Sequence, residues 1–225
     1  MNTLMKKKNE SSEQLNIQLF LLCMLAALLC RRLGKISSLR IICGMLRTMI
    51  YVGVYIGWGI SIYKRVIQKS VRNVLIFIAE LIIFWFVVRT TKYFFTMDNQ
   101  IARYLWYSYY IPMLFIPVAV LQAAFFLGKS EEYRLPKWLK GVYIPTAVLV
   151  LLVLSNDLHQ LVFSFPVGSA WSDSHYTYGW GYYVVLVWEV VCALTAFVLM
   201  IYKCRHSCKC QYKNVGFISY KHVGK

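Results

Sequence analysis

The residues best suited to chemistry are Ser155, Asn156, Asp157 and His159, which follow an uncharged run over residues 141–154. An ionisable side chain in hydrocarbon costs at least ~2.5–3.5 kcal/mol, so such groups tend to lie at the membrane rim or face a cavity lined by protein. On a helix, Asn156 and His159 share one face, whereas Asp157 turns to the side. The stretch is either a polar helix end that meets water or a site that binds a ligand or senses a signal.

Aromatic side chains gather at the ends of two apolar runs, at Trp106, Tyr107, Tyr109, Tyr110, Tyr178, Trp180, Tyr182 and Tyr183. Trp and Tyr form belts at membrane interfaces because one end of each ring is apolar and the other is polar. The more specific hypothesis is an outward-facing cup in which some of these rings surround the polar cluster. The residues of this ligand- or signal-sensing site are Ser155, Asn156, Asp157, His159, Trp106, Tyr110 and Trp180.

Two carboxylates, Glu80 and Glu189, lie inside apolar runs. A carboxylate within a membrane is costly, and it often marks a proton relay or a hydrogen-bond partner inside a bundle. The alternative is a structural hydrogen bond between helices, which contributes roughly 0.6 kcal/mol on average. We favour the structural interpretation of both intramembrane polar residues.

Metal binding and catalysis find little support. The residue nearest to His159 that could share a metal ion is His175, and the spacing fits no metal motif. A second cluster consists of Cys204, His206, Cys208 and Cys210. A structural zinc site usually needs a distant second pair, so lipidated or reduced thiols are the alternatives. No nucleophile pattern accompanies Asp157 and His159, although His159 could serve a pH-responsive gate. We predict no catalytic residue, no metal and no cofactor.

The composition is that of a membrane protein. The chain is 59% hydrophobic and 15% charged, and apolar runs that approach the ~20 residues of a membrane-spanning helix recur along it. The net charge of +16 resides in short clusters between these runs, as expected of loops near anionic lipid rather than of a nucleic-acid surface. We therefore predict an all-α, polytopic bundle in contact with the lipid bilayer, and no nucleic-acid partner.

Three regions are predicted along the chain. Residues 1–14 are a cytoplasmic basic tail, residues 15–202 are a transmembrane helical bundle, and residues 203–225 are a second cytoplasmic basic tail. Within the bundle we expect six spans, at 15–30, 48–63, 73–88, 105–128, 141–163 and 178–202. Pro112 and Pro117 should kink the fourth span, because each removes an amide donor and crowds the preceding turn. Gly53 and Gly57 should let helices approach closely.

The distribution of Lys and Arg predicts the orientation. Residues 203–225 hold six, the loop over 129–140 holds four, and the loop over 164–177 holds none, which places the tails inside and Asp157 outside. The connector over 31–47 disagrees, because its five positive residues would lie outside. Either the first apolar run is an interfacial helix, or the connector lies flat at the outer surface.

Several segments together resemble the N-terminal 7TM region of histidine kinases, a bacterial membrane input domain. They are YLWY at 104–107, YIPMLFIP at 110–117, RLPKW at 134–138, SNDLHQLVF at 155–163 and YGWGYY at 178–183. The resemblance covers roughly residues 47–203, and Ser155 stands where the family more often has Thr. It implies seven helices that sense a signal and pass it to a cytoplasmic output module. Because the chain ends 23 residues after the sixth span, we expect a truncated copy without that module.

The sequence therefore predicts a signal-sensing input domain in a bacterial plasma membrane, without kinase activity of its own. Its expected partners are the bilayer and a membrane or cytoplasmic signalling protein, with a homo-oligomer as a further option. One alternative is a small transporter or channel subunit with Glu80 and Glu189 on its path, although the chain shows no internal repeat. Another is a structural or partner-binding membrane subunit.

Overall fold

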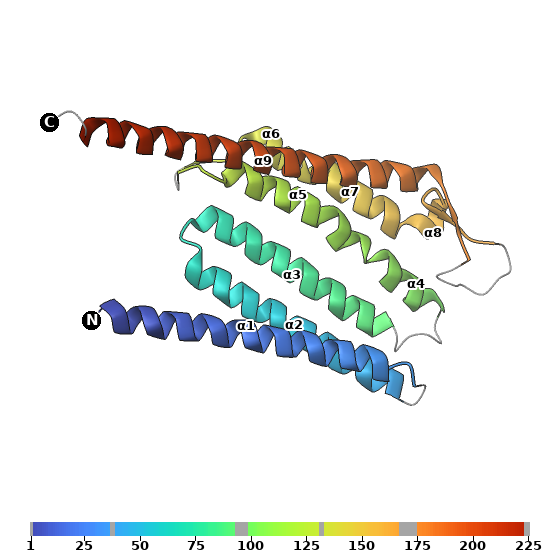
Figure 1. The fold of residues 1–225 in the computed structure, drawn as a ribbon. Coiled ribbons are helices and arrows are strands. Elements are labelled where there is room, and N and C mark those ends of the chain that lie inside the picture. The colour runs from blue at the N-terminus through green and yellow to red at the C-terminus, as the bar shows by residue number, and fades with distance from the viewer. Residues whose placement is uncertain (1, 37–38, 93–98, 131–132, 167–174, 223–225) are drawn as a thin grey trace.

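The structure is a bundle of long helices that lie side by side (Figure 1). The computed structural model describes residues 2–36, 39–92, 99–130, 133–166 and 175–222. The elements are α1 (Asn2–Leu33), α2 (Arg40–Arg65), α3 (Lys69–Lys92), α4 (Asn99–Tyr107), α5 (Tyr110–Phe126), α6 (Lys137–Gly141), α7 (Tyr143–Leu154), α8 (Asn156–His159), β1 (Phe163–Ser164), β2 (Thr177–Tyr178) and α9 (Trp180–His222).

The two ends of the bundle differ in what they carry (Figure 1). At one end α1 passes into α2, α3 ends near the start of α4, and α8 is followed by the two short strands; we call this the hairpin end. At the other end α1 begins and α9 ends; we call this the terminal end. The arrangement places the polar cluster of residues 155–159 at the hairpin end.

Within the described residues, five helical segments are long and apolar enough to cross a membrane: Arg40–Arg65, Lys69–Lys92, Gln100–Phe126, Lys137–Leu154 and Trp180–Arg205. They confirm the predicted all-α membrane bundle and correspond to the second to sixth predicted spans. The first predicted span, residues 15–30, lies within α1, which packs along α2. The predicted tails are helical where they are described, because α1 already begins at Asn2 and α9 continues to His222.

The basic connector predicted over residues 31–47 is largely helical. Arg31 and Arg32 lie in the last turn of α1, and α2 begins at Arg40. Lys35 lies in the turn between the two helices. The choice between an interfacial first helix and a connector that lies flat at the outer surface stays a prediction. Gly53 and Gly57 are exposed on α2, and a Cβ added at either would meet no atom within 4 Å. Among the described residues, no helix therefore makes the predicted close approach at these two glycines.

The predicted kink of the fourth span appears as a break between α4 and α5, at Ser108 and Tyr109. Ser108 precedes Pro112 by four residues, so its carbonyl is the one that the proline ring crowds and leaves without an amide donor. The carbonyl instead accepts from Ile111 N at 3.2 Å, a tighter bond of the 3₁₀ type. Pro117 lies inside α5 and does not interrupt it.

The central helix is α5, which packs against α3, α7 and α9. Its fully buried residues include the small side chains Ala119 and Ala124, which allow close packing. At the terminal end, Lys203 of α9 donates from Nζ to the carbonyls of Ala124 at 2.8 Å, Phe125 at 2.7 Å and Leu127 at 2.9 Å. An ammonium carries three donors and suits the negative end of a helix dipole. Lys203, which the sequence assigns to the tail, therefore ties α9 to α5 within the bundle.

Candidate functional site

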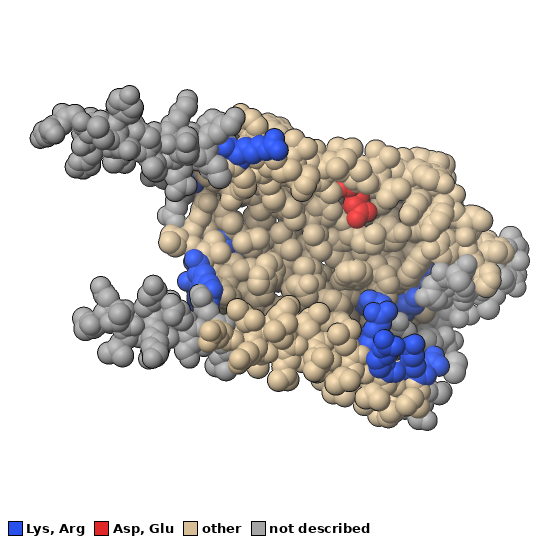
Figure 2. Space-filling view, in the orientation of Figure 1, with Lys and Arg blue, Asp and Glu red and all other residues tan. Residues whose placement is uncertain are grey.

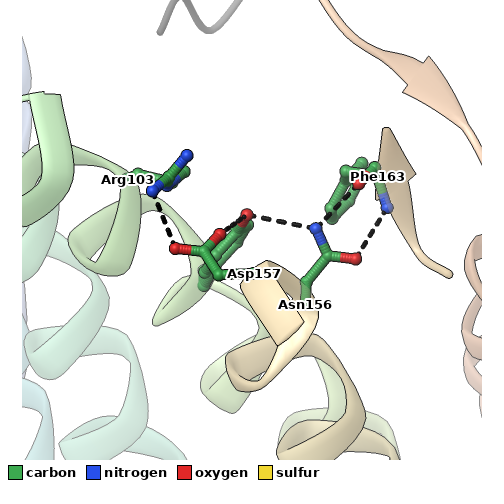
Figure 3. A network of polar contacts seen from close by, with 5 residues as sticks. Arg103, Asn156, Asp157 and Phe163 are labelled. Atoms are coloured by element: carbon green, nitrogen blue, oxygen red, sulfur yellow. Dashed lines mark hydrogen bonds and ion pairs between the residues drawn. The ribbon is translucent and has the colours of Figure 1, made fainter. Parts of the chain in front are cut away.

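Asn156, the first residue of α8, is fully buried and uses every hydrogen-bonding position of its side chain (Figure 3). Nδ2 donates to Tyr107 Oη at 3.1 Å and to the Phe163 carbonyl at 2.8 Å. Oδ1 accepts from the amides of Val162 and Phe163, both at 3.0 Å. An amide side chain offers two donors and two acceptor positions, so none remains for a ligand. Asn156 is therefore a structural centre of the cluster.

Asp157 points away from this turn toward α4 (Figure 3). Its Oδ2 forms an ion pair with Arg103 Nη2 at 2.8 Å, and its Oδ1 accepts from Tyr107 Oη at 2.8 Å. The Arg103 and Asp157 side chains are 27% and 16% exposed, so solvent reaches this part of the network. One continuous network thus joins α4, α8 and β1, and its accessible part is the ion pair.

His159 and Ser155 fasten the other side of α8. The backbone amide of Leu161 donates to His159 Nδ1 at 3.0 Å, so this nitrogen carries no proton. Ser155 donates its own proton to the Leu151 carbonyl at 2.7 Å and lies 3.2 Å from His159 Nε2. The serine oxygen is then the acceptor for an Nε2–H. In this arrangement Nδ1 is the acceptor of the His159 ring, and Nε2 is the nitrogen that faces Ser155.

The chain leaves α8 through Gln160, whose φ of 49° is left-handed, and then runs against the start of α9. The Leu161 carbonyl accepts from Gly181 N at 3.0 Å, and the Val162 carbonyl accepts from Gly179 N at 2.9 Å. A Cβ on Gly179 would lie 2.1 Å from the Leu161 oxygen, and one on Gly181 would lie 3.0 Å from it. These contacts explain the two glycines in the YGWGYY segment.

Aromatic rings surround Phe163, which is completely buried. Trp106 lies 4.7 Å from it between ring centroids, and Tyr110 lies 5.6 Å from it. The structure thus brings these two predicted site residues to the polar cluster, but the Phe163 ring fills the space between them. Trp180 is 61% exposed and lies outside the buried cluster around Phe163.

The intramembrane carboxylates lie apart from this network. Glu80 is exposed on α3, where it lines a groove of about 280 Å³ together with Tyr55 and Ile60 of α2. Glu189 is partly buried on α9. In the part of the chain that the structure describes, neither forms an ion pair or a side-chain hydrogen bond. The predicted bond between helices at these residues stays a prediction.

The search for a metal centre covers only described side chains, and among them no three His, Cys, Asp or Glu residues lie close enough to hold an ion. Cys204 is exposed on α9. The side chains of His206, Cys208 and Cys210 fall outside the described residues, so the structure does not bear on that predicted cluster.

Sequence reasoning missed Arg103 as a partner of Asp157 and Phe163 as the centre of the aromatic cluster. Arg103 and Tyr107 are four residues apart and share a helix face, which is the signal that could have linked them. Their partner lies 50 residues beyond Tyr107, and helix periodicity does not report a contact over that separation.

Asn156→Ala should lower the free energy of unfolding by at least about 2 kcal/mol, because it leaves the amides of Val162 and Phe163 buried without acceptors at about 1–3 kcal/mol each. Thermal unfolding in detergent measures the change. Leu158→Ala is the matched control on the same helical turn, where the side chain is 88% exposed. Equal stability of the two variants would contradict the structural role of Asn156.

Alanine at Gly179, just before α9, and at Gly181, in its first turn, should destabilise the protein to different degrees. Gly179→Ala places a methyl group at less than van der Waals distance from a backbone oxygen that cannot rotate away, whereas Gly181→Ala requires only a small shift. Gly141→Ala, where an added Cβ meets nothing within 4 Å, is the control. We expect the highest melting temperature for Gly141→Ala, a lower one for Gly181→Ala and the lowest for Gly179→Ala. Any other order would be evidence against this packing.

Comparison with known proteins adds one match. A model of the N-terminal 7TM region of histidine kinase matches residues 41–219, a range that contains α4, the α8 turn and the described contacts with α9. No curated protein and no solved structure matches the chain. The match covers most of the sequence and confirms the resemblance inferred from its segments. The chain belongs to the family of N-terminal 7TM regions of histidine kinases.

Proposed function

We propose that this chain is a signal-sensing input region in a bacterial plasma membrane, which it crosses several times, and that the hairpin end faces outward. The observation that carries the proposal is the network through Arg103, Asp157, Tyr107 and Asn156. It joins α4 to the α8 turn, and the same turn is hydrogen-bonded to the start of α9. A change at the accessible ion pair would therefore reach α9 directly.

The network combines a rigid part with an accessible part. Asn156 and Phe163 are fully buried. Every hydrogen-bonding position of the Asn156 side chain is used, and the Phe163 ring is packed among aromatic rings, whereas the Arg103–Asp157 pair is partly exposed. Arg103 also keeps a buried Nε without a hydrogen-bond partner in the described residues. Because the ion pair is partly exposed, a competing acceptor can approach the guanidinium from solvent and release Asp157. The ion pair thus has the properties of a latch.

The remaining part of the proposed pathway is α9. It runs without interruption from the α8 turn to the terminal end of the bundle (Figure 1), where Lys203 ties it to α5. We propose that it carries the signal toward an output module beyond the terminal end of the bundle. The chain itself then performs no phosphoryl transfer, and autophosphorylation of the purified protein would contradict this part of the proposal.

The proposed orientation can be tested with two single cysteines introduced into a cysteine-free protein. Leu158 lies at the hairpin end and is 88% exposed, and Ile67 lies between α2 and α3 at the terminal end and is 87% exposed. In intact cells, an impermeant maleimide should label Leu158→Cys and should label Ile67→Cys only after permeabilisation. The reverse pattern would place the polar cluster inside.

Release of the latch should change the environment of Cys204, which is exposed near the terminal end of α9. With the other cysteines replaced by serine, Asp157→Asn should alter the labelling rate of Cys204 in proteoliposomes. An ion pair of partly exposed groups contributes on the order of 1 kcal/mol, which shifts a two-state equilibrium by about fivefold.

The matched control exchanges the charges. Arg103→Asp combined with Asp157→Arg rebuilds an ion pair and should return the Cys204 labelling rate toward that of the unmodified latch. Lys137→Gln, an exposed change on α6, should leave the rate unchanged. If Asp157→Asn lowers the melting temperature but does not affect Cys204, the network stabilises the fold without signalling through α9.

A further inference from the structure

A second site lies at the hairpin end, away from the Asp157 network. It is a cavity of about 350 Å³ between the end of α1, the start of α2 and the end of α3. Its walls include four arginines, Arg31, Arg40, Arg47 and Arg89. Figure 2 shows basic side chains gathered at this end of the bundle, while the surface between the two ends is largely free of them.

None of these four arginines forms an ion pair with a carboxylate among the described residues. Among the described residues, the ion pair seen with a carboxylate is that of Arg103, and it involves none of the four. A guanidinium cannot shed its charge in a protein, so like charges around one cavity repel one another unless an anion joins them. Within the described residues, the cavity thus carries four positive charges without a paired carboxylate, and guanidinium groups bind oxyanions through paired hydrogen bonds.

The deeper wall of the cavity is aromatic. Tyr51 follows Arg47 by one turn of α2, and Phe86 precedes Arg89 by one turn of α3. Because the two helices run in opposite directions, both rings lie on the side toward the middle of the bundle, and they contact each other at 4.9 Å between centroids. Charge at the rim and apolar surface below match a molecule with an anionic head and an apolar body.

We propose that this cavity binds an amphiphile with a phosphate head group, held by the four arginines, with its apolar part against Tyr51 and Phe86. The proposal concerns binding and does not rest on a sensing role. It also accounts for Arg31, Arg40 and Arg47, three of the five positive residues over 31–47 that disagree with the charge-based orientation. In this proposal they lie at the hairpin end because they bind an anion rather than because they mark a cytoplasmic loop. The phosphate group could belong to a membrane phospholipid or to a soluble compound.

The test measures lipid retention by native mass spectrometry of the full chain from mixed phosphatidylglycerol and phosphatidylcholine nanodiscs. Wild type should retain phosphatidylglycerol preferentially. A basic residue near an anionic lipid contributes about 1 kcal/mol, or about fivefold, so Arg40→Gln with Arg89→Gln should reduce retention by about thirtyfold. Lys64→Gln with Arg65→Gln, at the other end of α2, removes the same charge outside the cavity and should retain the lipid.

A second variant separates the cavity from general surface charge. Gly44 lines the cavity, and an added Cβ there meets nothing within 4 Å, so Gly44→Leu should occupy the space without changing charge or unfolding α2. Loss of phosphatidylglycerol in Gly44→Leu supports the site even if the arginine variant does not fold. Retention by Gly44→Leu, or equal loss in the Lys64/Arg65 control, overturns it.

The source of the phosphate is decided by a parallel titration of the detergent-purified protein with inorganic phosphate. Saturable phosphate binding that is lost in Gly44→Leu, without a preference among lipids, supports the site with a soluble phosphate compound as its ligand. Preference for phosphatidylglycerol that is lost in the same variant supports a lipid. Absence of both kinds of binding in the wild type would overturn the proposal.

Discussion

The described part of the hairpin end depends on one buried amide, the side chain of Asn156. Where the chain turns out of α8, the backbone of Leu161 to Phe163 forms no helix, and in an apolar bundle such groups must still be paired. Asn156 pairs both polar groups of Phe163 and the amide of Val162, and His159 pairs the amide of Leu161. The carbonyl of Leu161 accepts from Gly181 of α9, and that of Val162 accepts from Gly179, just before α9 begins. Polar residues therefore appear here because an irregular backbone needs them.

That requirement organises the neighbouring elements. Once the turn is fixed, Phe163 enters the aromatic cluster, its strand pairs with Tyr178, and the start of α9 packs onto Leu161 with only glycines able to fit. Asp157, on the same helical turn as Asn156, is directed to Arg103. Adjacent residues of one turn thus have different roles. The hydrogen bonds of Asn156 hold the structure, whereas the ion pair of Asp157 is accessible to solvent.

The sequence was sufficient for the helical class and for five of the six predicted spans, because apolar run length reports these directly. It also indicated the polar cluster of residues 155–159, because residue type reports it. It also located the prolines, and the break at Ser108 follows from Pro112. The sequence did not show that the polar side chains of this cluster form their hydrogen bonds within the protein. Asn156 and His159 resemble ligand-binding residues as long as the turn that consumes their hydrogen bonds is unknown. Counting charges by loop likewise assigned Arg89 to a different segment from Arg31 and Arg40. Only the packing of α1, α2 and α3 shows that the three residues line one cavity.

The length of α9 has a geometric consequence. At 1.5 Å per residue, its 43 residues extend about 65 Å, roughly twice the ~30 Å hydrocarbon thickness of a bilayer. Lys203 fixes the azimuth of this helix, its rotation about its own axis, relative to α5. The part of α9 beyond Lys203 continues the helix in the same direction. Each residue of helix advances the azimuth by about 100°. A protein that docks beyond Lys203 would meet a different face of the helix after insertion of a single residue, and nearly the same face after insertion of seven.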